Sequence, residues 1–98
     1  MESRHTQRLL IKNPHSHALT LIIEPWADEL VMPAGAIYEV VGEGPGDNCF
    51  EVLAEGMNFF VFGWPGSTAT VFCDGQLLRD FHVPAPPLPK ARSGEIVS

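Results

Sequence analysis

Short runs of alternating apolar and polar residues, separated by glycine, proline, asparagine and aspartate, restrict the fold of this chain more than any other feature. We find about seven such runs in residues 1–82, and a period of two places apolar side chains on one face of a β-strand. No run shows a helical period over a useful length. The sequence therefore predicts an all-β domain, a small antiparallel β-sandwich or barrel of about seven short strands, with no helix longer than two turns.

Three segments show how far this pattern can be followed. Residues 36–43 alternate without a break, so that one face is apolar and the other carries glutamates. Asp74-Gly75 joins the last two runs and fits a two-residue type I′ hairpin, because both central residues of that turn need positive φ. Residues 29–32 lie between two prolines and fit either a short strand or one helical turn.

The composition changes at residue 83. Of the 98 residues, 45% are hydrophobic and 18% are charged, which is typical of one globular domain. Residues 83–98, however, are rich in proline and favour an extended polyproline II conformation that builds no core. We expect a single domain over residues 1–82 followed by a flexible, disordered tail over residues 83–98.

The charge and the N-terminal sequence limit the possible partners and locations. Twelve acidic against six basic residues give a net charge of -6, and no run of Lys or Arg could follow a phosphate backbone. We therefore expect no nucleic acid and no membrane partner, since no apolar stretch approaches the roughly 18 residues that span a bilayer. The N-terminus lacks the apolar segment of a secretory signal, which favours a cytoplasmic, soluble protein with Cys49 and Cys73 reduced.

Several short motifs resemble a known family. Residues 19–26 read Leu-x-Leu-x-Ile-Glu-Pro-Trp, residues 31–35 Val-Met-Pro-Ala-Gly, residues 38–41 Tyr-x-Val-Val, and residues 71–75 Val-x-x-Asp-Gly. Together they resemble a family of short bacterial proteins of unknown function. The resemblance implies a small β-rich domain and a bacterial origin, and it implies no activity.

The most suggestive candidates for metal binding are His15 and His17. Two histidines at i and i+2 on a strand point the same way and can share one metal ion, and Glu24 would add a carboxylate. The order of these residues superficially resembles the metal motifs of cupins, although Glu24 lies far from His17 and Tyr38 stands where that family has a second-motif histidine. The alternative is a pair of solvated turn histidines beside Pro14.

Residues 57–64 form the most hydrophobic run and are apolar on both faces. Phe60, Phe62 and Trp64 share one face of the expected strand, where a sandwich strand should meet water. Something must cover this face, either an internal segment or a second subunit, because exposed apolar patches mark contact sites. We expect a homodimer, most simply a two-fold one.

The two tryptophans each have two interpretations. Trp26 and Trp64 both stand beside a proline, where an exposed indole can serve as a binding platform or can close one end of a sandwich. The Trp26 loop and residues 29–32 are the internal segments that could cover the aromatic face.

No nucleophile in the sequence has an evident base beside it, and no cofactor motif is present. The sequence therefore favours a non-enzymatic protein-interaction or accessory domain without a cofactor, and the alternative is a small metal-binding β protein that uses His15 and His17.

Overall fold

The computed structural model describes residues 4–46 and 48–87, and within them the chain forms eight strands and no helix. The strands are β1 (Arg4–Lys12), β2 (Leu19–Glu24), β3 (Asp28–Met32), β4 (Ile37–Pro45), β5 (Glu51–Glu55), β6 (Asn58–Phe62), β7 (Thr68–Cys73) and β8 (Gln76–Phe81). The all-β prediction is confirmed. The undecided segment 29–32 is a strand, because its backbone pairs with β2.

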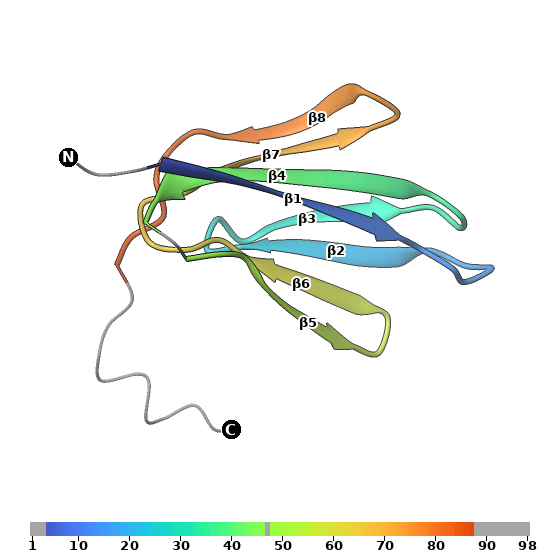
Figure 1. The fold of residues 1–98 in the computed structure, drawn as a ribbon. Helices are drawn as coiled ribbons and strands as arrows, with labels where there is room; N and C mark the ends of the chain where they lie inside the picture. Colours follow the sequence, from blue (N-terminus) through green and yellow to red (C-terminus); the bar gives the residue numbers. More distant parts are fainter. Residues whose placement is uncertain (1–3, 47, 88–98) are drawn as a thin grey trace.

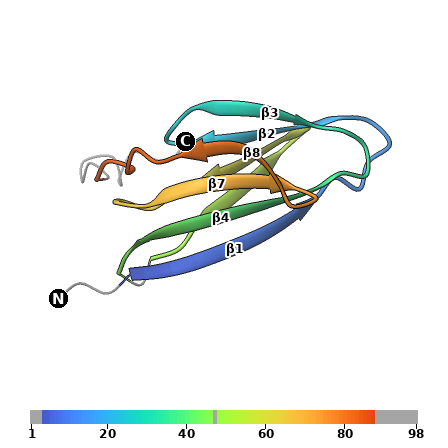
Figure 2. The same cartoon turned by 90° about the horizontal axis from the view of Figure 1, so that it is seen from above.

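The strands form two four-stranded sheets packed face to face (Figures 1 and 2). The first sheet has the order β1-β4-β7-β8, and the second has the order β3-β2-β6-β5. All neighbours are antiparallel except β2 and β6, which run parallel, so the expectation of a purely antiparallel sandwich is wrong at this pair. The chain crosses to the first sheet as β4 and returns to the second sheet as the edge strand β5. β6 then turns back between β5 and β2 and runs in the direction of β2.

Local turn chemistry explains the β7–β8 hairpin. Asp74 and Gly75 have φ of 53° and 76°, as the type I′ prediction requires. The alternation predicted for residues 36–43 is also confirmed, since Tyr38 and Val40 face the core while Ile37 on the opposite face is exposed.

The core lies between the sheets and is built by the inward side chains of both. Leu21, Ile23 and Val61 come from the second sheet, and Val40 and Val71 from the first, each with no exposed surface. Burying side chains of this size contributes about 1.5–3 kcal/mol each.

No helix among the described residues is long and apolar enough to cross a membrane.

Trp64 belongs to this core and not to the aromatic face predicted for it. It is only 3% exposed, its ring meets Phe50 edge-on at 5.3 Å, and its indole N–H donates to the carbonyl of Pro45 at 3.1 Å. β6 ends at Phe62, so the alternation that placed Trp64 beside Phe60 and Phe62 no longer applies. Its interpretation as an exposed binding platform is wrong.

Trp26 contacts the first residues of the predicted tail. Its ring stacks on Phe81 at 5.2 Å, and its indole N–H donates to the carbonyl of Val83 at 2.8 Å. Ala85 is buried, where its N–H donates to Ser67 and its carbonyl accepts from Gly66. The ordered domain thus extends past the predicted boundary at residue 82, because these backbone groups find partners in the 66–67 loop. Residues 88–98 lie outside the described residues.

Candidate functional site

The outer face of the second sheet carries an apolar stripe that crosses its strands. The register places Ile22 of β2 beside Phe60 of β6, and Phe60 beside Leu53 of β5. Phe62 stacks near Phe60 with ring centroids 6.2 Å apart. Val31 of β3, which is opposite Thr20 and diagonal to Ile22, extends the apolar surface onto β3. We call this set of residues the apolar stripe; it consists of Ile22, Val31, Leu53, Phe60 and Phe62.

The stripe is accessible along most of its length. Val31 is 65% exposed, Leu53 51% and Phe62 36%, whereas Ile22 is buried between its neighbours. Neither internal segment considered from the sequence covers it, since β3 lies beside β2 in the same sheet and Trp26 packs on Phe81 of the first sheet. Phe60 and Phe62 therefore share the outer face of the sheet, as the alternation predicted, with Phe60 half-buried and Phe62 exposed.

Charge is divided unequally between the two sheets. The strands of the second sheet contain five carboxylates and no Lys or Arg, while the four Lys and Arg residues of the described chain all lie on the first sheet. Arg79 of β8 donates to Asp28 at 2.7 Å across one side of the sandwich. No salt bridge within the described ranges reaches the other four carboxylates, which are Glu24, Glu29, Glu51 and Glu55.

These four glutamates surround the apolar stripe. The register sets Glu29 beside Ile22, and it sets Glu24 and Glu51 on either side of Phe62. The result is an apolar centre with a rim of one sign of charge. Such a face attracts cationic groups and repels anionic ones.

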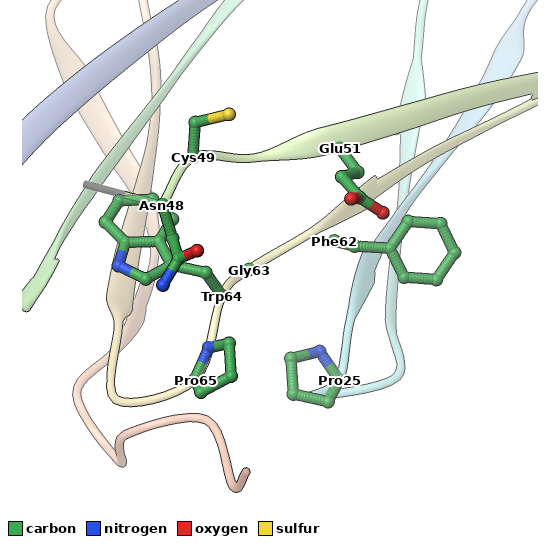
Figure 3. A pocket seen from close by; sticks show the side chains of 8 residues that line it. All are labelled: Pro25, Asn48, Cys49, Glu51, Phe62, Gly63, Trp64 and Pro65. Atoms are coloured by element: carbon green, nitrogen blue, oxygen red, sulfur yellow. The ribbon is translucent and has the colours of Figure 1, made fainter. Parts of the chain in front are cut away.

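A cleft of about 320 Å³ continues the stripe at the end of the sandwich where β6 finishes (Figure 3). Glu51 and Phe62 lie together at one end of it, and Asn48 and Cys49 at the other. The cleft is lined by Pro25, Asn48, Cys49, Glu51, Phe62, Gly63, Trp64 and Pro65. Glu51 is the one charged residue in this set, so the cleft suits an apolar side chain with a cationic neighbour.

The cleft wall is closely packed behind Gly63. A Cβ at this position would lie 2.8 Å from Ser67 Oγ and 2.8 Å from the Trp26 ring, so any larger residue would have to displace one of them. Among the described residues no histidine lines the cleft, so within them the Cys49 thiol has no imidazole base beside it there. Both cysteines are free thiols, Cys49 exposed and Cys73 half-buried against the core.

The structure keeps His15 and His17 together but places Glu24, which the sequence grouped with them as a metal ligand, elsewhere. His15 and His17 lie in the bend before β2 and not on a strand, yet their rings stack with centroids 5.3 Å apart. Glu24 lies at the far end of β2, roughly 16 Å along the strand from Leu19 at about 3.3 Å per residue, whereas the histidines precede the strand, so its grouping with them is wrong. No group of three His, Cys, Asp or Glu residues suited to a metal ion occurs in the part of the chain that the structure describes.

Met57 is the residue near the histidines that sequence reasoning missed. Its Sδ lies 3.3 Å from Nε2 of His17, although the two residues are 40 positions apart. The β5–β6 turn brings it there, since the backbone N–H of Thr20 donates to the carbonyl of Met57 at 2.9 Å. No local pattern could have indicated this contact.

Comparison of the chain with protein-family models, curated proteins and solved structures finds no significant match. The resemblance noted from the short motifs therefore stays an expectation.

Proposed function

We propose that this domain is a non-enzymatic protein-interaction module that binds its partner on the outer face of the second sheet. The observation that carries the proposal is an exposed apolar stripe on a sheet with five carboxylates and no Lys or Arg. The partner that fits this surface is a protein segment with an apolar anchor flanked by Lys or Arg.

The stripe and the cleft would have different roles in such a complex. Phe60, Phe62 and Leu53 supply apolar area, and aromatic side chains near the centre of a contact commonly contribute most of its binding energy. The cleft beside Phe62 can receive one apolar side chain, while Glu51 at its edge attracts a cation. Burial would supply affinity, and the rim of glutamates would select the partner.

Charge argues against a two-fold pairing of this face with itself. A second copy placed face to face would bring the four rim glutamates of each chain against those of the other. Like charges in such contact are destabilising and steer the copies apart. The two-fold dimer expected through Phe60 and Phe62 is therefore less favoured than a cationic partner.

A titration of the ¹⁵N-labelled domain with a short peptide tests the proposal. The peptide has a central tryptophan flanked by lysines, and its control has glutamates in place of the lysines. We expect the lysine peptide, but not the glutamate peptide, to shift the backbone amide resonances of β5, β6 and the cleft. Added salt should weaken this effect. Shifts located elsewhere, or equal shifts with both peptides, would contradict the proposal.

Two substitutions make this test specific. Phe62→Ala should reduce affinity for the lysine peptide about tenfold or more, because it removes an aromatic contact. Leu77→Ala is the matched control, since Leu77 is 51% exposed but lies on the first sheet. Equal binding by the Phe62→Ala and Leu77→Ala variants would place the binding surface elsewhere.

The second candidate function is binding of a soft metal ion, and the contact between His17 and Met57 favours it. Two imidazoles and a thioether form a donor set that suits Cu(I). Titration with Ag(I), a stable substitute, should shift the resonances of both histidines and of the Met57 methyl group. His17→Ala and Met57→Leu should abolish these shifts, whereas His82→Ala, at an exposed histidine outside this loop, should not.

A further inference from the structure

Two edge strands lie along the same side of the sandwich, β1 of the first sheet and β5 of the second. The side-chain oxygen of Gln7 on β1 accepts a hydrogen bond of 2.7 Å from the N–H of Phe50, directly before β5. Farther along, a groove of about 290 Å³ is lined by the end of β1 and by the β5–β6 turn. At the opposite side, the Arg79–Asp28 salt bridge joins β8 to β3.

The side of the sandwich formed by β1 and β5 has two open strand edges. Each of the two strands pairs with one neighbour within the described residues and so leaves one row of backbone N–H and C=O groups open. Val52 of β5 is opposite the buried Val61 and shares its inward face, yet it is 51% exposed. All five residues of β5 are exposed, which shows that no strand of the first sheet covers it.

The outward residues of the two edges have complementary patterns. On β1 they are Arg4, Thr6, Arg8, Leu10 and Lys12; the last three lie level with β5, because Gln7 contacts Phe50, and Leu10 is 74% exposed. On β5 they are Glu51, Leu53 and Glu55, with the same spacing of two residues. One edge thus presents cation, leucine, cation, and the other presents carboxylate, leucine, carboxylate.

We propose that two copies of this chain form a two-fold dimer in which β1 of each copy pairs with β5 of the other. The two strands run in the same direction within one chain (Figure 1), so the new pairs are parallel. The register that matches charge sets Leu10 beside Leu53, Arg8 beside Glu51, and Lys12 beside Glu55.

Symmetry makes this arrangement closed. Both edges lie on one side of the sandwich, so a two-fold axis along the strands uses each edge once per copy and leaves neither open on that side. The first sheet of one copy continues into the second sheet of the other, and the half-exposed Val52 side chains come under the partner's strands. A parallel contact of β1 with the partner's β1, or of β5 with the partner's β5, would place like charges together.

The dimer does not depend on the proposed function, although Glu51 and Glu55 border both surfaces. The cationic strand β1 lies outside the apolar stripe, so the two can be tested separately. Arg8 also pairs with Glu39 of its own chain at 3.2 Å, but its side chain is 70% exposed and remains accessible to a partner.

Size-exclusion chromatography with light scattering, over a range of protein concentrations, tests the dimer. We expect the unaltered chain to be dimeric, and the charge-reversed variants R8E/K12E and E51K/E55K each to be monomeric, with dissociation constants raised about tenfold or more. Asp80→Lys is the control, because this exposed charge lies on β8 at the opposite edge.

Mixing the two variants gives the decisive result. In a mixed pair every reversed strand meets an oppositely charged edge, so an equimolar mixture should form a heterodimer although neither variant associates alone. Because only folded chains can re-associate in this way, such rescue also excludes misfolding as the cause of dissociation. A monomeric unaltered chain, or a dimer that both variants retain, would overturn the proposal. Loss of the dimer in Phe62→Ala but not in R8E/K12E would move the interface to the apolar stripe.

Discussion

The side-chain amide of Asn13 donates a hydrogen bond to the carbonyl oxygen of Met32 at 3.0 Å, which fastens the loop after β1 to the end of β3. The same amide nitrogen lies 2.9 Å from the carbonyl of His17 and 3.2 Å from that of Pro33. The side-chain oxygen of Asn13 accepts from the N–H of His15 at 3.0 Å. Asn13 is fully buried, and it sets the backbone path that brings the two histidines together.

Asn13→Ala should therefore lower the free energy of unfolding by about 2 kcal/mol or more, because it leaves the buried carbonyl of Met32 and three part-buried backbone groups without their side-chain partner. Urea denaturation measures the change. Ser16→Ala, at an exposed position of the same loop, is the control and should change stability by less than about 0.5 kcal/mol. Equal stability of the two variants would show that the Asn13 bonds contribute little.

The free energy of unfolding should fall at alkaline pH as the Tyr38 hydroxyl loses its proton. Burial, followed by the nearby Cys73, raises the pKa of its hydroxyl above the ordinary value of 10.0, while Arg79 partly opposes this shift. The hydroxyl also donates to the carbonyl of Val31 at 2.9 Å, which joins the two sheets. A raised pKa means that the folded chain holds the Tyr38 proton more tightly than the unfolded chain does. The protonated hydroxyl therefore contributes fully to folding stability below the unfolded pKa near 10.0, and this contribution is lost as pH rises through the folded pKa.

Ultraviolet titration can follow Tyr38 directly, because it is the only tyrosine in the chain. Tyr38→Phe should cost about 1 kcal/mol at neutral pH, from the lost hydrogen bond, and should reduce the alkaline decline. An ordinary phenol pKa in the folded protein would contradict this expectation.

Gly75→Val should destabilise the protein by about 1 kcal/mol or more, because a β-branched residue is strained at the φ of 76° found here. A Cβ at this position meets no atom within 4 Å, so the cost comes from backbone conformation alone. Gly75→Asn is the comparison, since asparagine tolerates positive φ better than other residues do. Thermal unfolding of both variants should rank asparagine well above valine.

Truncation should locate the end of the domain. A chain ending at Val83 loses the two backbone hydrogen bonds of Ala85 and its burial, and we expect its melting temperature to fall by more than about 4 °C. A chain ending at Pro87 keeps these contacts and should melt close to the full-length protein. If both truncated chains melt alike, the Ala85 contacts do not stabilise the domain.

Features encoded by neighbouring residues could be predicted from the sequence. The two faces of residues 36–43 follow from alternation with period two, and the hairpin at Asp74-Gly75 follows from the φ angles that this turn requires. The position of Phe60 and Phe62 on one shared face of their strand follows from alternation as well. Trp64 could not, because its direction depends on where β6 ends and on the space available beside Phe50.

Features that depend on which strands become neighbours were decided only by the tertiary structure. Period-two alternation states which way a side chain points but not which strand lies beside it, so the parallel β2–β6 pair was not evident. The contact between His17 and Met57, and the gathering of carboxylates on one sheet, arise in the same way. The sequence by itself determined an all-β chain with an aromatic run to cover. The packing of two sheets decided where that run lies and what charge surrounds it, because both depend on contacts between residues far apart in the chain.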